Sequence, residues 1–362
     1  MKICFLVPSL VAGGAEHVMS HMANFWANKS YSVSIITLNH PQETPFYPLE
    51  EGVDLIQLNL LEKGNSFQKA VLFFKQWNAI RREINIIKPN VLIAFLDITI
   101  LLALTVRPFI QAKVIVSERN NPYLNETNPL LKKINHFLYR FSDQLVLQTN
   151  QIAHTFPHHL QNKIRIIPNP VLPPSHKLQD KSQEQSTHTI ISMGRLKWQK
   201  GYDILIKAFA PLAKAHKEWS LVIIGEGDER HHLESLCRQE GVSEQVQLVG
   251  RRYNPYDMLK EASVFVLSSR FEGFPNALCE AMAIGLPCVA TQCQFGPEEI
   301  IEHNVNGILV KVNDEIALRN ALELLIESST LRKKLGEHAL KITERFALAK
   351  VMNQWELLIE NT

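Results

Sequence analysis

The sequence has few of the residues that mark disulfide-rich secreted proteins or zinc-binding domains. Its 362 residues include five cysteines, at positions 4, 237, 279, 288 and 293, and no Cys-x-x-Cys pair. An odd number of scattered thiols predicts neither a disulfide framework nor a zinc site, and it favours a reducing compartment. The fourteen histidines form no cluster of metal-ligand spacing, and no Asp-x-Asp occurs. We therefore expect no bound metal.

Long hydrophobic runs are also absent. The longest apolar stretch, residues 91–106, has 16 residues and contains Asp97, whereas a membrane-spanning helix needs about 20. The first eight residues carry one basic residue and no small-residue cleavage site, so they predict a buried strand rather than a signal peptide. These observations favour a cytoplasmic protein.

Net charge is close to balanced over the whole chain but not within it. The formal charge is +2, which gives no reason to expect a nucleic-acid partner. Residues 1–178 hold 17 Lys and Arg against 11 Asp and Glu, whereas residues 179–362 hold 21 against 25. The first half is therefore better suited to an anionic surface or ligand.

Short apolar runs alternate with segments of helical periodicity along nearly the whole chain. This alternation predicts parallel sheets covered by helices on both faces, and hence an α/β fold. A chain of 362 residues is too long for one ordinary hydrophobic core, so two domains are expected. The runs that predict strands are 3–7, 33–38, 91–95, 114–116, 144–147, 163–167, 190–193, 221–224, 246–249, 264–267, 288–290 and 307–310.

The expected boundary between the domains follows a group of prolines. Pro168, Pro170, Pro173 and Pro174 end the first series of strands, and residues 175–189 are polar. We predict an N-terminal domain over 1–174 and a C-terminal domain over 186–345. The final segment, 346–362, carries an apolar stripe that includes Trp355, so we expect it to pack on a domain, with the N-terminal one a candidate.

A glycine-containing turn follows the first predicted strand. Gly13, Gly14, Ala15 and Glu16 open a helix, where glycine allows close backbone approach and free amides can bind an anion or hydroxyl. A plain strand-to-helix turn explains the pattern equally well. Neither Gly-x-Gly-x-x-Gly nor a P-loop motif occurs, which disfavours nicotinamide and P-loop nucleotide binding.

A loop in the second half carries two cations between glycines. Gly194 and Gly201 bracket Arg195 and Lys200 directly after a predicted strand. The guanidinium can bind two phosphate oxygens at once, and the ammonium adds a second charge. A solvated basic loop is the alternative.

A second constellation lies at 271–282, where Pro275 is suited to the first turn of a helix. Glu272 precedes this helix and Glu280 lies on its second turn, among apolar neighbours. We expect the amides of residues 276–278 to face a ligand, with a phosphate favoured by the helix dipole. The two carboxylates would accept hydrogen bonds from hydroxyl groups, although a solvated helix face is also possible.

Together these features predict a pocket for a diphosphate that carries hydroxylated rings at both ends. A nucleotide-sugar is the simplest ligand of this form. Because no Asp-x-Asp is present, Arg195, Lys200 and a helix dipole would have to neutralise the leaving diphosphate without a metal.

These motifs, together with 225–227, 285–290 and 306–310, resemble in sequence and order the retaining GT-B glycosyltransferases of family four. The resemblance spans essentially the whole chain. It implies two Rossmann-like domains facing across a cleft, with the donor held mainly by the C-terminal one, and metal-independent transfer with retention. It implies catalytic roles for Arg195, Lys200 and Glu272. It further implies donor-binding roles for Gly13, Gly14, Ala15, Glu16, Arg119, Gly194, Gly225, Gly250, Arg251, Gly273, Phe274, Asn276, Ala277, Leu278 and Glu280.

The first half is most similar to the bacterial N-acetylgalactosaminyltransferases that extend undecaprenyl-diphosphate-linked oligosaccharides. The similarity rests on residues 94–97 and 116–120. Arg119 stands where those enzymes often carry His; it can replace the charge of that His but not its proton transfer. A structural Glu118–Arg119 ion pair is the alternative role.

A basic helical segment in this half is a candidate for contact with an acceptor or a membrane. Lys69, Lys75 and Arg82 lie on a predicted helix with several aromatic residues. Contact with an anionic membrane or a lipid diphosphate is one interpretation, and a solvated face is the other.

The expected function is transfer of an N-acetylhexosamine such as GalNAc, or a hexose, from a UDP-sugar to a polyprenyl-diphosphate-linked or other glycan acceptor. We expect the enzyme at the cytoplasmic surface of the membrane, with UDP-sugar as substrate and no cofactor. The alternatives are a nucleotide-sugar epimerase or phosphorylase on a similar scaffold, and a non-catalytic two-lobed sugar-binding protein.

Overall fold

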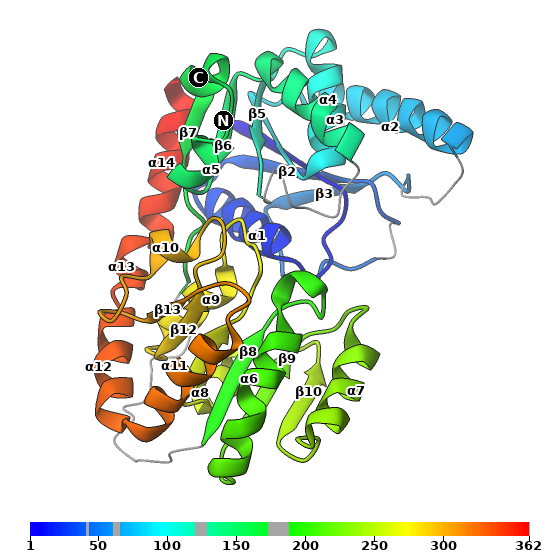
Figure 1. The fold of residues 1–362 in the computed structure, drawn as a ribbon. Helices are drawn as coiled ribbons and strands as arrows, with labels where there is room; N and C mark the ends of the chain where they lie inside the picture. The colour runs from blue at the N-terminus through cyan, green and yellow to red at the C-terminus, as the bar shows by residue number, and fades with distance from the viewer. Residues whose placement is uncertain (41–42, 61–65, 120–128, 173–187, 362) are drawn as a thin grey trace. The chain divides into compact units, whose positions relative to one another are not determined.

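The fold is taken from a computed structural model, which describes residues 1–40, 43–60, 66–119, 129–172 and 188–361. The chain divides into two compact units (Figure 1). Unit 1 consists of Met1–Asn169 and Val351–Thr362, and unit 2 of Pro170–Lys350. The predicted linker, 175–189, lies almost entirely outside the described residues.

Unit 1 contains a parallel sheet in the order β3-β2-β1-β4-β5-β6-β7. Each strand of a parallel sheet is buried on both faces, which is why β1 and β4 are nearly continuous apolar runs. The strands are β1 (Lys2–Val7), β2 (Ser32–Thr37), β3 (Val53–Gln57), β4 (Val91–Phe95), β5 (Lys113–Ser117), β6 (Gln144–Leu147) and β7 (Ile164–Ile166). The helices are α1 (Gly14–Asn28), α2 (Ser66–Ile87), α3 (Asp97–Val106), α4 (Pro129–Leu138), α5 (Asn150–Ala153) and most of α14 (Leu348–Asn361).

Unit 2 contains a second parallel sheet, in the order β10-β9-β8-β11-β12-β13. Its strands are β8 (Thr189–Met193), β9 (Ser220–Ile224), β10 (Val246–Gly250), β11 (Val264–Leu267), β12 (Cys288–Thr291) and β13 (Ile308–Val310). Its helices are α6 (Tyr202–Ala215), α7 (Arg230–Glu240), α8 (Tyr256–Glu261), α9 (Asn276–Ala283), α10 (Pro297–Ile300), α11 (Glu315–Glu327), α12 (Ser329–Ala339) and α13 (Ile342–Arg345).

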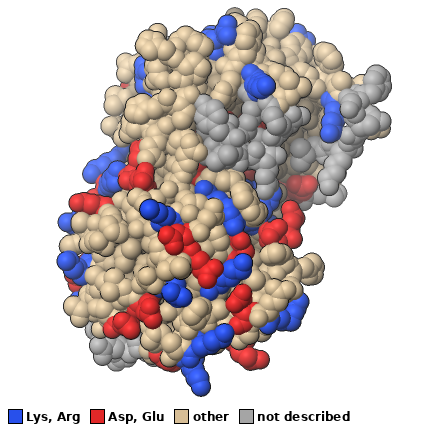
Figure 2. Space-filling model, viewed as in Figure 1, with Lys and Arg blue, Asp and Glu red and all other residues tan. Residues whose placement is uncertain are grey.

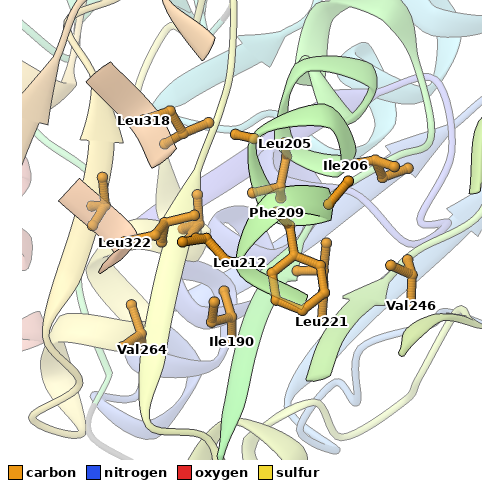
Figure 3. Close-up of a cluster of buried hydrophobic side chains, with 14 of the residues drawn as sticks. Ile190, Leu205, Ile206, Phe209, Leu212, Leu221, Val246, Val264, Leu318 and Leu322 are labelled. Atoms are coloured by element: carbon orange, nitrogen blue, oxygen red, sulfur yellow. The ribbon is translucent and has the colours of Figure 1, made fainter. Parts of the chain in front are cut away.

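Alternate residues of the unit 2 strands enter two separate hydrophobic clusters. Ile190 packs with residues of α6, α7 and α11 on one face, whereas the next residue, Ile191, packs with residues of α8, α9 and α13 on the other. Phe209 of α6 lies in the middle of the first cluster, next to Leu212 and Leu221 (Figure 3). The helices therefore cover both faces of the sheet, as the alternation in the sequence predicts.

The terminal helix α14 buries the apolar stripe predicted for it. Val351, Met352, Trp355, Leu358 and Ile359 are all buried. The residues from Val351 onward group with unit 1, and Lys29 Nζ, at the C-cap of α1, forms an ion pair with Glu356 at 2.8 Å. Within the described residues, every helix is too short or too polar to cross a membrane.

Candidate functional site

The order of strands in unit 2 places the candidate site at the edge where the strands end. Successive strands run from β8 to β10 in one direction and from β11 to β13 in the other, so β8 and β11 are adjacent although the chain visits β9 and β10 between them. Ligands of open α/β sheets bind outside the carboxyl ends of the strands at such a reversal. The loop carrying Arg195 and Lys200 follows β8, and the loop carrying Glu272 follows β11.

The structure brings Lys200 and Glu272 together at this edge. Lys200 Nζ lies 2.6 Å from Glu272 Oε1, and Ser269 Oγ donates a second hydrogen bond to the same oxygen at 2.5 Å. The side chains are 15% and 7% exposed, respectively. A buried carboxylate needs such partners because removal from water penalises its charged form. The site therefore contains a largely buried ion pair between Lys200 and Glu272.

The β8 loop is held against the β11 loop by backbone contacts that depend on glycine. Gly201 has φ +63°, and a Cβ atom there would lie 2.2 Å from the carbonyl oxygen of Ser268. The Ser268 hydroxyl in turn donates to the carbonyl oxygen of Lys200 at 2.8 Å. Glycine is thus required at 201 by both the left-handed backbone and the close approach, and it fixes the position of Lys200.

A further ion pair braces the same two loops. Arg270 donates to both carboxylate oxygens of Asp203, at 2.7 and 2.9 Å, and to the carbonyl oxygen of Trp198 at 2.6 Å. Burial favours protonated Asp203, but the Arg270 guanidinium outweighs this effect and holds the pKa of the carboxyl below its usual value. The sequence alone gave no reason to pair these residues, which are 67 positions apart.

Arg195 differs from Lys200 in its surroundings. Its side chain is exposed, and no described residue forms an ion pair or a side-chain hydrogen bond with it. The neighbouring Leu196 amide donates to the carbonyl oxygen of Glu226 at 3.0 Å, which ties this loop to the end of β9. Gly225 at that strand end has its own constraint, because a Cβ atom there would lie 1.8 Å from the carbonyl oxygen of Gly194.

Two of the predicted donor-binding residues, Gly250 and Arg251, lie at the end of β10 and directly after it. Gly250 accepts a hydrogen bond at its carbonyl oxygen from the Gly225 amide at 3.0 Å, and Arg251 is exposed. The Arg230 guanidinium holds the pKa of Glu226 below its usual value, with Arg251 adding a smaller effect. Arg251 thus lies near Glu226, beside the loop that follows β9.

One expectation for α9 is wrong in part. The amides of Asn276 and Leu278 donate to the backbone oxygens of Phe274 and Pro275, at 3.0 and 3.1 Å, and are not free to face a ligand. Among the described hydrogen bonds of this turn, none comes from the Ala277 amide. Proline at the N-cap allows a tight first turn whose own carbonyls use two of the three donors.

The other predicted residues of this segment lie around the same turn. Gly273 and Phe274 are buried, and the Phe274 ring packs against Phe346 with ring centroids 5.5 Å apart. Glu280 is half-buried, and its charge contributes to the raised pKa of Tyr256, of which burial is the larger cause. Glu280 is therefore partly shielded from solvent, as its apolar neighbours in the sequence predict.

In unit 1 the turn after β1 forms as predicted, and α1 begins at Gly14. A Cβ atom at Gly13 would lie 2.2 Å from Glu16 Oε2, so the glycine makes room for that buried carboxylate. The next strand in space is β4, and Asp97 begins α3 two residues after this strand ends. The strand order of this sheet also reverses between β1 and β4, so both loops lie at its candidate ligand-binding edge.

Arg119 is buried in unit 1 and uses its donors on protein groups. Nε donates to Ser117 Oγ at 2.9 Å, and Nη1 donates to Asn169 Oδ1. The guanidinium also lies over the rings of Phe95 and Trp355, at 4.7 and 5.9 Å from their centroids. Burial lowers its pKa, but an arginine remains cationic at neutral pH. These contacts hold the terminal helix, and a donor-binding role for Arg119 stays a prediction.

A buried polar cluster beside Arg119 was missed by the sequence reasoning. Tyr139 Oη donates to Glu118 Oε2 at 2.9 Å, and Asn135 Nδ2 donates to the backbone oxygen of Asp97 at 2.8 Å. Asp97 Oδ2 and Asn135 Oδ1 are buried with no hydrogen-bond partner in the described residues. The signal in the sequence is weak, because these residues come from three separate segments.

The three cations predicted to contact an acceptor or membrane all lie on α2. Lys69, Lys75 and Arg82 are exposed, and Arg82 forms an ion pair with Glu83 at 3.0 Å. They are not part of either strand-end site. Over the face shown in Figure 2, basic and acidic side chains are interspersed on unit 2.

Both halves of the chain match glycosyltransferase families. Residues 12–173 match the family described as Glycosyltransferase Family 4, and residues 175–342 match Glycosyl transferases group 1. Two parallel α/β units of this kind are the architecture of the GT-B fold. The chain belongs to the family-four GT-B glycosyltransferases, which confirms the fold and the family expected from the sequence.

The chain is similar over its full length to two bacterial proteins. A Campylobacter jejuni enzyme, GalNAc-alpha-(1->4)-GalNAc-alpha-(1->3)-diNAcBac-PP-undecaprenol alpha-1,4-N-acetyl-D-galactosaminyltransferase, is 30% identical over 99% of this chain and 98% of its own. An uncharacterized glycosyltransferase of Haemophilus influenzae is 28% identical over 98% and 99%.

Solved structures agree in fold. Sucrose-phosphate synthase from Thermosynechococcus elongatus superposes with a TM-score of 0.86 at 17% identity, covering 99% of this chain and 98% of that one. Anabaena Alr3699/HepE in complex with UDP and glucose superposes with a TM-score of 0.81 at 18% identity, with full coverage of both chains. At these identities the likeness establishes the fold alone.

Proposed function

We propose that this glycosyltransferase moves an N-acetylhexosamine such as GalNAc, or a hexose, from a UDP-sugar to a polyprenyl-diphosphate-linked or other glycan acceptor in bacterial surface glycan assembly. The observation that carries the donor half of the proposal is the Lys200–Glu272 pair at the strand reversal of unit 2. The full-length similarity to an undecaprenol-linked GalNAc transferase supports the acceptor half.

Lys200 would bind the diphosphate of the donor. An ammonium group has three donors, and one of them is directed to Glu272 Oε1 in the structure. The others can bind phosphate oxygens while the carboxylate keeps the lysine in place. Arg195, whose side chain is exposed after β8, would add a guanidinium as negative charge develops on the departing UDP.

Glu272 would face the donor sugar and Glu280 the ribose. With Lys200 and Ser269 both bonded to Oε1, Glu272 retains acceptor capacity at Oε2 for a sugar hydroxyl. The reaction would proceed with retention. The acceptor hydroxyl would attack the face from which UDP departs, and a departing phosphate oxygen would take its proton.

The acceptor would bind to unit 1 at the strand reversal between β1 and β4. Asp97 Oδ2 and Asn135 Oδ1 are buried acceptors without described partners, and such groups suit the hydroxyls of a sugar.

We further propose that the protein works at the cytoplasmic surface of the membrane. We also propose that binding of the donor needs no metal or cofactor, because Arg195 and Lys200 supply the neutralising charge.

The test is a panel of UDP-, GDP- and ADP-sugars offered with a lipid-linked acceptor extract, in the presence and absence of EDTA. We expect release of UDP that depends on the acceptor, a product heavier by one sugar, and an α-configured linkage by NMR. Conversion of a UDP-sugar without acceptor would indicate an epimerase, and a requirement for inorganic phosphate a phosphorylase. Loss of activity with EDTA would contradict metal independence.

A further inference from the structure

Helix α4 of unit 1 carries a stripe of exposed apolar side chains. Its inward face carries Asn135 and Tyr139, which are 0% and 1% exposed. Its outward face carries large apolar side chains at positions 130, 134 and 137, and the stripe continues at 141 in the following turn. Their exposed fractions are 63% for Leu130, 38% for Ile134, 55% for Phe137 and 51% for Phe141. A helix on the surface of a globular domain ordinarily shows the opposite arrangement.

The inward hydrogen bonds of α4 keep this orientation. Asn135 is held to the backbone oxygen of Asp97, and Tyr139 to the carboxylate of Glu118. Rotation of the helix to bury its apolar stripe would break both bonds and leave Glu118 without this donor in the interior. The apolar stripe is therefore fixed on the outside, and a contiguous apolar surface of this kind is typical of an interaction site.

The charged residues that border the stripe on this segment are basic. They are Lys133 and Arg140, and residues 129–142 contain no acidic residue. Lys133 is exposed, and the Arg140 guanidinium lies 3.9 Å from the centroid of the Phe137 ring. Apolar residues that can enter the acyl region, bordered by cations that can reach phosphate headgroups, are the pattern of an interfacial helix on an anionic membrane.

Helix α2 extends this surface beyond α3. Helix α3 packs against both α2 and α4 (Figure 1). Phe74 of α2 is 65% exposed, and Lys75 beside it is exposed as well. Both helices thus present exposed aromatic and basic side chains from the same part of unit 1.

We propose that the outward face of α4, formed by Leu130, Ile134, Phe137 and Phe141 with Lys133 and Arg140, docks unit 1 on an anionic lipid bilayer. The inference rests on the proposed function for its purpose, since a polyprenyl-linked acceptor resides in a membrane. The inner face of the same helix holds the Asp97 and Glu118 cluster, so docking would place the membrane next to the proposed acceptor site.

The experiment measures co-sedimentation of the full chain with vesicles, without donor or acceptor. Vesicles of phosphatidylglycerol and phosphatidylethanolamine are compared with vesicles of phosphatidylcholine, at low and high salt. The test variant is Phe137→Ser/Phe141→Ser. The matched control is Ile316→Ser/Leu324→Ser, which removes two exposed apolar side chains from α11 of unit 2. A second variant, Lys133→Gln/Arg140→Gln, removes two cations and keeps all four apolar side chains of the stripe.

We expect the chain and the α11 control to bind anionic vesicles, and the Phe137/Phe141 variant to partition roughly a hundredfold less, from the loss of two inserted rings. The charge variant should lose the preference for anionic lipid and the salt dependence. Unchanged thermal unfolding would verify that each variant is folded.

Three results would overturn the proposal. The first is that the unaltered chain fails to bind anionic vesicles at low salt. The second is that the Phe137/Phe141 variant and the α11 control bind equally well. The third is that light scattering shows the unaltered chain to self-associate and the Phe137/Phe141 variant to be monomeric. Because no sugar substrate is present, these outcomes are independent of whether the proposed transfer reaction occurs.

Discussion

Lys200 Nζ lies 2.6 Å from Glu272 Oε1, although 72 residues separate the two in the chain. Adjacent strands β8 and β11 end side by side and deliver both loops to one point. Glu272 is nearly fully buried, and Lys200 and Ser269 supply the hydrogen bonds that a buried carboxylate needs. The pair therefore has a structural role in addition to its proposed role in diphosphate binding.

The two roles of Lys200 can be separated by a double substitution. Lys200→Ala should lower turnover by about ten- to a thousandfold, the scale of losing one transition-state donor. It should also lower the free energy of unfolding by on the order of 3 kcal/mol, because a buried carboxylate is left unpaired. Adding Glu272→Gln should restore much of the stability but none of the turnover. Urea unfolding and UDP-release kinetics measure the two effects; full stability of Lys200→Ala alone would contradict the structural role.

Arg195 should behave differently, because its exposed side chain has no described partner. Arg195→Ala should leave thermal unfolding unchanged and reduce turnover by about ten- to a thousandfold through loss of charge at the departing UDP. Lys207→Ala, which removes an exposed cation from α6, serves as the control and should retain full activity. Equal rates for the two variants would remove Arg195 from the proposed diphosphate site.

Two glycines with the same backbone conformation allow a test of the close contact below Lys200. Gly201 and Gly241 have φ +63° and +71°, but a Cβ atom at 201 would meet the Ser268 carbonyl oxygen at 2.2 Å, whereas nothing lies within 4 Å at 241. Gly241→Ala should cost about 1 kcal/mol of unfolding free energy from the left-handed backbone alone. Gly201→Ala should cost at least about 1–3 kcal/mol more and should impair turnover by displacing Lys200. Similar losses from both substitutions would show that the contact is unimportant.

The arrangement of strands could be predicted well from the sequence. All twelve predicted strands are present within one or two residues, because buried parallel strands are nearly continuous apolar runs. The strand that was missed, β3, is at the edge of its sheet and is only partly buried. Asp54 interrupts its apolar run, which an edge strand tolerates because it contacts water along one side.

The candidate site could be predicted in its motifs but not in its contacts. Glycine loops and charged residues after strands pointed to Lys200 and Glu272, because the ends of parallel strands gather at one edge. Which groups bond to each other depends on side-chain paths that spacing does not determine. Arg119 illustrates this: the resemblance implied contact with the donor, and spacing gave no sign that its guanidinium lies over the rings of Phe95 and Trp355.

The last prediction concerns the pH dependence of unit 1 and rests on His21 of α1. Burial, with a smaller effect from His17, lowers the pKa of His21 from 6.5 to about 4, and its Nε2 is buried without a described partner. The folded chain therefore binds this proton less readily than the unfolded chain between pH 4 and 6.5, so stability must fall as the pH is lowered through that window. At pH 5 this one group should lower the free energy of unfolding by on the order of 1–2 kcal/mol relative to pH 7.5.

The variant His21→Gln has no charge to gain at this position. Its free energy of unfolding, measured with urea, should therefore fall by that much less on acidification than that of the unaltered chain. His232→Gln, at an exposed position in unit 2, is the control and should follow the unaltered chain. If His21→Gln and the unaltered chain lose stability in parallel, His21 must titrate normally in the folded protein.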